Sequence, residues 1–163
     1  MKLKIPFFKQ RTGFYCGPAS LEMVLAFFKK YKTQKELAKE ARTKKDGTTH
    51  EEMIKVARRE GFYCYVHNNS TIEEIKHFIK QGLPVIINYK EPSSEEGHYA
   101  VISGYKKSRL ILNDPWNGNN FKIKEKEFLR RWHDYHKKHE YKNWILVLSR
   151  KNLNLGKLFL PTK

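Results

Sequence analysis

Cys16 is the first residue of this sequence whose surroundings could make it reactive. It stands directly before Gly17 and Pro18, and proline is favoured in the first turn of a helix because its missing N–H would be unpaired there anyway. The pattern therefore predicts a helix that begins near Cys16. The free N–H groups and the dipole at such a helix start would stabilise a Cys16 thiolate, which is a nucleophile. Without further context, a lone cysteine is more often a small core residue.

Three further residues supply that context. His98 opens the apolar run 98–105, which predicts a strand that would hold the imidazole on a rigid element. Asp114 ends the next predicted strand, and adjacent antiparallel strands can bring its carboxylate to the second nitrogen of the imidazole. Gln10 lies within reach of a loop from Cys16, where its amide could donate to the oxyanion formed when a thiolate attacks a carbonyl. This set predicts acyl chemistry with a Cys-His-Asp triad.

Helices dominate the part of the chain that should position Cys16. Apolar residues spaced i, i+3, i+4 and i+7 follow Cys16, and two capping boxes, at 33–36 and 49–52, predict two more helices. A strand over 62–66 and a helix from Ser70 or Thr71 to Gly82 complete this half.

The second half should form the sheet that carries His98 and Asp114. Short β-branched or aromatic runs separated by turn residues predict strands at 83–89, 98–105, 110–113, 121–123 and 143–148, with one helix at 125–132. Helices followed by strands indicate an α+β fold with an antiparallel sheet. We expect a single domain over residues 1–148. The apolar residues of the tail 149–163 indicate that it packs on the domain or contacts a partner.

The charge balance is strongly basic. The chain has 33 Lys and Arg against 17 Asp and Glu, a formal net charge of +16, which raises the possibility of nucleic-acid binding. The basic residues are dispersed, and lysines far outnumber arginines, whereas bidentate recognition of phosphates and bases favours arginine. A solvated surface that binds polyanions weakly, non-specifically and in a salt-sensitive way is the favoured interpretation.

Membrane insertion and export are not expected. The longest apolar run, 23–28, is far shorter than the roughly 18 residues of a membrane-spanning helix, and no export signal is visible at the start. Two cysteines are too few for a disulfide-stapled secreted scaffold. A cytoplasmic location is therefore predicted.

The remaining candidate residues favour structural roles. Cys64 lies inside a predicted strand and is interpreted as a packing residue. His133, His136 and His139 could suggest metal binding, but lysines lie among them and no cysteine or paired carboxylate joins them. A solvated basic segment is the favoured interpretation there, and neither a metal nor an organic cofactor is predicted.

Three segments of the chain resemble a known family. Residues 10–20 (QRTGFYCGPAS), 97–105 (GHYAVISGY) and 113–115 (NDP) are similar, in order, to the three motifs of the C39 cysteine peptidases. These are papain-like domains best known for cutting double-glycine leader peptides. The resemblance covers about residues 5–148 and implies a papain-like fold. It implies Cys16 as nucleophile, His98 as general base and acid, Asp114 as its orienting group and Gln10 as oxyanion-hole donor.

The sequence thus predicts a cysteine peptidase acting on a peptide or protein. Tyr15, Gly97, Tyr99 and Trp116 neighbour the proposed catalytic groups and would line the substrate site. Narrow aromatic walls, like the resemblance, favour small residues just before the scissile bond. Two alternatives stay open: an acyltransferase or non-peptide amidase with the same triad, and a basic polyanion-binding module whose triad is vestigial. The oligomeric state is not predicted.

Overall fold

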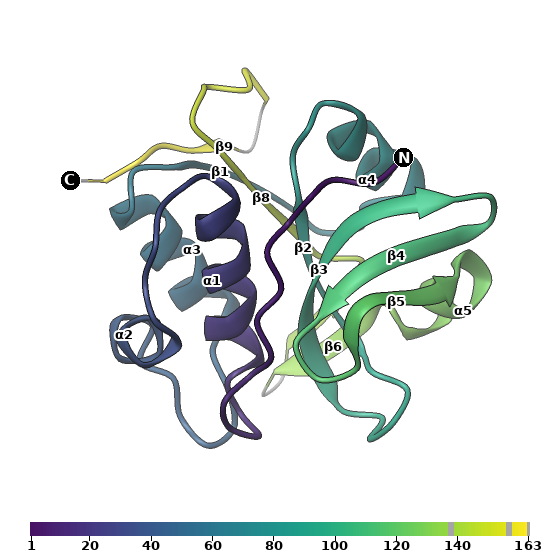
Figure 1. Cartoon of the computed structure of the whole chain (residues 1–163), viewed down its shortest axis with the longest axis horizontal. Helices are drawn as coiled ribbons and strands as arrows, with labels where there is room; N and C mark the ends of the chain where they lie inside the picture. The colour runs from purple at the N-terminus through teal and green to yellow at the C-terminus, as the bar shows by residue number, and fades with distance from the viewer. Residues whose placement is uncertain (137–138, 156–157, 163) are drawn as a thin grey trace.

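An antiparallel sheet separates two groups of helices (Figure 1). The structure is a computed structural model, and it describes residues 1–136, 139–155 and 158–162. On one face of the sheet lie α1 (Cys16–Phe27), α2 (Gln34–Glu40) and α3 (His50–Arg59). On the other face lie α4 (Ile72–Lys80) and α5 (Glu125–Arg131). The α+β class predicted from the sequence is confirmed.

The main sheet has the strand order β5-β4-β3-β2-β8-β1-β9 over the described residues, and every neighbouring pair is antiparallel. Its strands are β1 (Tyr63–His67), β2 (Val85–Lys90), β3 (Gly97–Lys106), β4 (Arg109–Asp114), β5 (Gly118–Lys124), β8 (Ile145–Ser149) and β9 (Leu158–Phe159). Because β1 joins this sheet beside β8, the helical half of the chain also contributes one strand to it.

Threonine caps begin three of the helices, as the sequence predicts for two of them through their capping boxes. The side chains of Thr33, Thr49 and Thr71 each accept a hydrogen bond from the N–H three residues later, at 3.1, 3.2 and 3.0 Å. Gly61 and Gly82 follow the ends of α3 and α4 with φ values of +96° and +81°, where glycine is tolerated best. Local sequence thus determines where these elements start and stop.

The first residues of the chain run along β3 and β4. Leu3 N–H donates to Ser103 O at 2.7 Å, and Asn113 Nδ2 donates to Ile5 O at 3.0 Å. A Cβ at Gly104 would lie 2.4 Å from Met1 O, so this close approach needs glycine. The segment is thereby led between α1 and the sheet toward the loop that carries Gln10 (Figure 1).

The structure differs from expectation after α5. The segment expected to be a solvated basic stretch forms a hairpin of β6 (His133–His136) and β7 (His139–Lys142), with residues 137–138 outside the described part. Its mixed polar sequence lacks the β-branched run that would have predicted strands, and β6 is held by packing beside β2.

The tail after β8 folds back on the domain where it is described. Leu153 and Leu158 pack against the core, and β9 pairs with β1, while Leu160 and Phe159 stay largely exposed. None of the helices in the described part of the chain has the length and apolar character that crossing a bilayer requires.

Candidate active site

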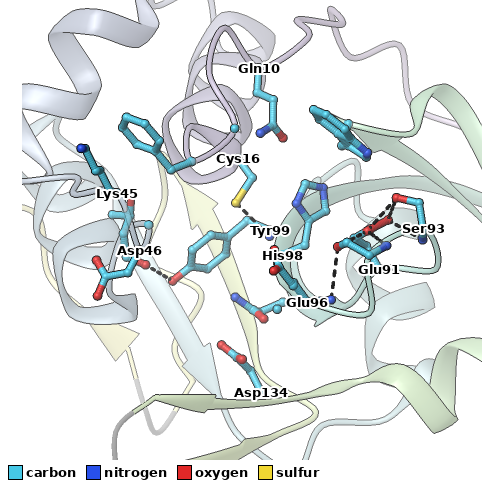
Figure 2. Close-up of a pocket in the computed structure, with 18 residues that line it drawn as sticks. Gln10, Cys16, Lys45, Asp46, Glu91, Ser93, Glu96, His98, Tyr99 and Asp134 are labelled. Carbon is cyan, nitrogen blue, oxygen red and sulfur yellow. Dashed lines mark hydrogen bonds between the residues drawn. The ribbon is translucent and has the colours of Figure 1, made fainter.

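A cavity of about 720 Å³ lies where the start of α1 meets the ends of β2 and β3 (Figure 2). Six of the eight residues predicted for the site line it: Gln10, Cys16, Gly97, His98, Tyr99 and Trp116. Asp114 lies behind His98, fully buried. Tyr15 is not among the lining residues, and its neighbour Phe14 is. Folding therefore gathers residues from three distant parts of the sequence around one cavity.

Cys16 is the first residue of α1, as the Cys-Gly-Pro pattern predicts. Its Sγ accepts a hydrogen bond from the Tyr99 N–H at 3.5 Å, which joins the helix start to β3. Gly17 is needed here because a Cβ would lie 2.9 Å from Thr48 Oγ1 and 3.1 Å from Met53 Sδ. The glycine lets the first turn of α1 pack directly against these side chains, which sets the position of the thiol.

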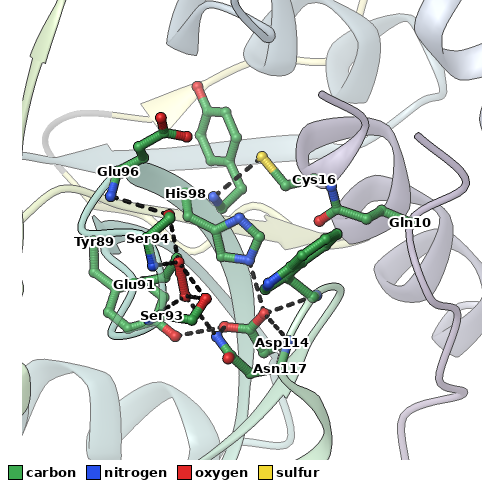
Figure 3. Close-up of polar contacts among 12 residues, drawn as sticks. Gln10, Cys16, Tyr89, Glu91, Ser93, Ser94, Glu96, His98, Asp114 and Asn117 are labelled. Carbon is green, nitrogen blue, oxygen red and sulfur yellow. Dashed lines mark hydrogen bonds and ion pairs between the residues drawn. The ribbon is translucent and has the colours of Figure 1, made fainter. Parts of the chain in front are cut away.

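His98 lies between Cys16 and Asp114 (Figure 3). Its Nε2 is 2.7 Å from Asp114 Oδ1, and the other ring nitrogen points toward the sulfur of Cys16. Asp114 is the last residue of β4, the strand next to β3 in the sheet. Adjacent antiparallel strands thus bring together two residues that are well separated in the sequence.

The electrostatics of the His98–Asp114 pair favour a charged imidazole. Burial by itself would lower the pKa of His98, but the hydrogen bonds and charges of Asp114 and Cys16 outweigh it and raise that pKa to about 10. Burial would raise the pKa of Asp114, but the hydrogen bond and charge of His98, with further donors, hold it down at about 2. The geometry therefore supports an imidazolium held by a carboxylate and facing a sulfur.

Further donors fix the Asp114 carboxylate. Oδ1 also accepts from the N–H groups of Trp116 and Asn117, each at 2.9 Å, and Oδ2 accepts from the Tyr89 hydroxyl at 2.5 Å. Burial and the Asp114 charge raise the pKa of Tyr89, so its hydroxyl remains a donor. Sequence analysis missed Tyr89 and Asn117. The turn after Asp114 was visible in the sequence, but nothing there showed that Tyr89 would face it.

Glu91 is a second buried carboxylate near the site that sequence analysis missed. It accepts from the backbone and hydroxyl groups of Ser93 and Ser94, and Asn117 Nδ2 lies 3.3 Å from both Glu91 Oε1 and Asp114 Oδ2. Burial opposes ionisation, but these bonds prevail and lower the pKa of Glu91 to about 2. Glu91 thereby holds the loop between β2 and β3, which forms one wall of the cavity.

Tyr99 connects β3, on one side of the cavity, to the loop before α3, on the other side. Its hydroxyl donates to Thr48 O at 2.8 Å and lies 2.7 Å from Nδ1 of His50, which stacks on Trp144 with ring centroids 4.1 Å apart. Lys45 and Asp46 belong to the same wall (Figure 2). The phenol ring is therefore held in one orientation beside Cys16, and the loop before α3 cannot shift without breaking these contacts.

Gln10 sits on the loop before α1 and is 8% exposed. Its backbone N–H donates to Pro115 O at 3.0 Å, and its Nε2 donates one hydrogen to Thr12 O at 2.8 Å. An amide nitrogen carries two hydrogens, so Gln10 Nε2 has a second N–H. The Gln10 side chain lines the cavity beside Cys16.

Among the described side chains, no three potential metal ligands come together. The side chains of His136 and His139 lie outside the described part of the structure. The neighbouring Asp134 instead points into the cavity from β6, against Gly97 (Figure 2).

The two cysteines differ sharply in environment, and this difference gives a testable prediction. Cys64 is fully buried, and burial raises the pKa of its thiol to about 12; at neutral pH only about 10⁻⁵ of it would be thiolate. Cys16 lines an open cavity. Brief treatment with iodoacetamide near pH 7, followed by mass-spectrometric mapping, should label Cys16 and spare Cys64. In denaturant both should react, and equal labelling of the native protein would contradict the assignment.

Comparison with known proteins gives one family match and several similar solved structures. The model of the Peptidase_C39 like family matches residues 2–140. No curated protein sequence matches the chain. The peptidase domain of Streptococcus ComA, a bifunctional ABC transporter of a quorum-sensing pathway, is 20% identical, with 89% of this chain and 98% of that chain covered and a TM-score of 0.73.

Two other solved structures are similar. A double-glycine-motif protease from an AMS/PCAT transporter, solved with its leader peptide, is 26% identical, with 90% and 93% of the two chains covered and a TM-score of 0.71. A protein described as a C39-like peptidase from Bacillus anthracis is 17% identical, with 93% and 98% covered and a TM-score of 0.73. The likenesses at 17% and 20% show the papain-like fold. Since the family model covers most of the sequence, the chain belongs to the Peptidase_C39 like family of cysteine-type peptidases.

Proposed function

We propose that Cys16, His98, Asp114 and Gln10 are the catalytic residues with which this peptidase hydrolyses peptide bonds. The observation that carries the proposal is the placement of His98, which bonds Asp114 at 2.7 Å through one ring nitrogen and turns the other toward Cys16. The cavity beside the sulfur is large enough for a peptide segment.

The proposed reaction has two halves. The Cys16 thiolate attacks the amide carbonyl, and the oxygen of the tetrahedral intermediate accepts a hydrogen bond from Gln10 Nε2. The C–N bond then breaks as the His98 imidazolium gives its proton to the leaving amine, which leaves a thioester on Cys16. A water molecule attacks this thioester after His98 takes one of its protons. The acid product leaves, and the thiolate and imidazolium are restored.

The substrate that we propose is an extended peptide with small residues before the scissile bond. Phe14 and the immobilised Tyr99 line the cavity together with Cys16, and so does Trp116, which is 52% exposed. Aromatic walls held this firmly leave little room for a large side chain. The leader peptide bound by the double-glycine-motif protease supports the same class of substrate.

Digestion of a peptide library tests this specificity. We expect cleavage mainly after Gly, Ala or Ser, because larger side chains would collide with the aromatic walls, and we expect the matched Cys16→Ala protein to leave the library intact. Mass spectrometry of the products gives residue frequencies on each side of the cut. Cleavage chiefly after large aromatic or basic residues would contradict the narrow site while leaving the catalytic assignment standing. Products that carry an added amine would indicate the acyltransferase alternative.

The charges in the cavity favour a peptidase over a polyanion-binding module. Among the described residues that line it, Asp46, Glu91, Glu96 and Asp134 are acidic and Lys45 is the one lysine, so a polyanion would be repelled from the site itself. Weak, salt-sensitive polyanion binding by the outer surface remains a prediction. The single domain over residues 1–148, the packing role of the tail and the cytoplasmic location are retained as parts of this proposal.

A further inference from the structure

Gln34 occupies an unusual place for a polar residue. It is the first residue of α2 and is only 2% exposed. Its Nε2 donates to Lys9 O and to Glu22 Oε1, and its Oε1 accepts from the Arg11 N–H, all at 2.9 Å. Both amide hydrogens and the amide oxygen are therefore used, and the side chain does not line the active-site cavity.

The two backbone groups that Gln34 binds flank Gln10. A single carboxamide thus pairs with the carbonyl before Gln10 and with the N–H after it, as a neighbouring β-strand would. On the other side, the Gln10 N–H is held by Pro115 O, next to Asp114. The backbone of Gln10 is therefore clamped between α2 and the turn after β4. This clamp leaves the Gln10 side chain free to face the cavity.

We propose that Gln34 is a positioning residue for Gln10, through which α2 sets the oxyanion-hole donor. The proposal rests on the proposed function. A donor to an oxyanion must lie within a few tenths of an ångström of its place, and a displacement of about 1 Å can cost on the order of 10²-fold in rate. Thr33 caps the start of α2 and so fixes the position of Gln34, the next residue, for its hydrogen bonds to the loop of Gln10.

Kinetics of Gln34→Ala should carry a signature that general destabilisation does not. We expect kcat to fall about 10-fold to 10²-fold with KM little changed, because the oxyanion exists only after attack and Gln34 does not contact the substrate site. Gln34→Glu would place a buried carboxylate oxygen against the Lys9 O and Glu22 Oε1 acceptors, so it should lower kcat at least as much as Gln34→Ala. Ser103→Ala, which removes a buried hydrogen bond to Ile111 O on the outer part of β3, is the matched control and should keep the wild-type kcat.

A double-mutant cycle with Gln10→Ala separates positioning from a merely structural role. Gln10→Ala alone should lower kcat by about 10²–10³-fold. In that background the donor is absent, so adding Gln34→Ala should lower kcat no further. An equal loss in both backgrounds would overturn the proposal, because Gln34 would then act by some route other than Gln10.

Selective ¹⁵N-glutamine labelling tests the same idea without turnover. The chain has three glutamines, Gln10, Gln34 and Gln81, so the wild-type spectrum holds three side-chain amide pairs. In Gln34→Ala the Gln10 pair should broaden or shift toward the random-coil position, while the pair of Gln81, exposed at the end of α4, stays unchanged as the internal control.

An unchanged Gln10 pair in a folded Gln34→Ala or Gln34→Glu protein would overturn the positioning role. This holds whether or not the protein cleaves peptides, so it is distinguishable from failure of the proposed function. That failure would show instead as absence of any cleavage that depends on Cys16.

Discussion

Replacement of His98 by alanine should abolish peptide cleavage. His98 is the group that bonds Asp114 and faces Cys16, so the variant loses the acid that protonates the leaving amine and the base that activates water. In comparable nucleophile–histidine systems such a loss costs on the order of 10⁶-fold in kcat. Steady-state hydrolysis of the best peptide from the library measures this loss, with Cys16→Ala as the blank.

The chain offers a matched control for this experiment. His67 on β1 also lies 2.7 Å from a carboxylate, that of Glu74, but the pair is part-exposed and three strands away from β3. His67→Ala should therefore keep the wild-type kcat. A kcat for His98→Ala close to that of His67→Ala would contradict the proposed mechanism.

Asp114→Asn should reduce kcat by about 10²–10⁴-fold while the protein stays folded. The asparagine oxygen can still accept from the Trp116 and Asn117 N–H groups, and its amide can donate to the Tyr89 hydroxyl. The change therefore removes mainly the negative charge that stabilises the His98 imidazolium. Near-native thermal stability together with the loss in rate would separate this effect from unfolding.

The pH dependence of kcat/KM should also reveal the loss of the Asp114 charge in Asp114→Asn. Asp114 raises the pKa of His98, which lies at about 10 in the native protein, so the imidazolium persists to high pH. Without the carboxylate that pKa must fall, and the alkaline limb of kcat/KM should move to lower pH. Glu74→Gln, the matched change in the surface pair, should leave the profile where it is. An alkaline limb that does not move in Asp114→Asn would contradict the assigned role.

Local sequence was sufficient to predict the helices and strands and the main reactive side chains. The helix at Cys16 follows from Gly17 and Pro18, and the helices after Thr33 and Thr49 follow from their caps, because these signals act within one turn of the chain. The strands that carry His98 and Asp114 follow from short apolar runs bounded by turns. Three spaced motifs then sufficed to predict the family, which the family model confirms.

Tertiary structure alone decided which side chains support these groups. Tyr89 bonds Asp114, Asn117 bonds Glu91, and Gln34 bonds the loop of Gln10, all through contacts between segments far apart in the sequence. The hairpin β6–β7, which brings Asp134 to the cavity, has little strand propensity of its own and depends on packing beside β2. Hydrogen bonds of this kind form only after the sheet has set the register of its strands, so no local pattern encodes them. The sequence by itself therefore determined the reactive groups and the elements that carry them, and the packing of those elements decided how each group is held.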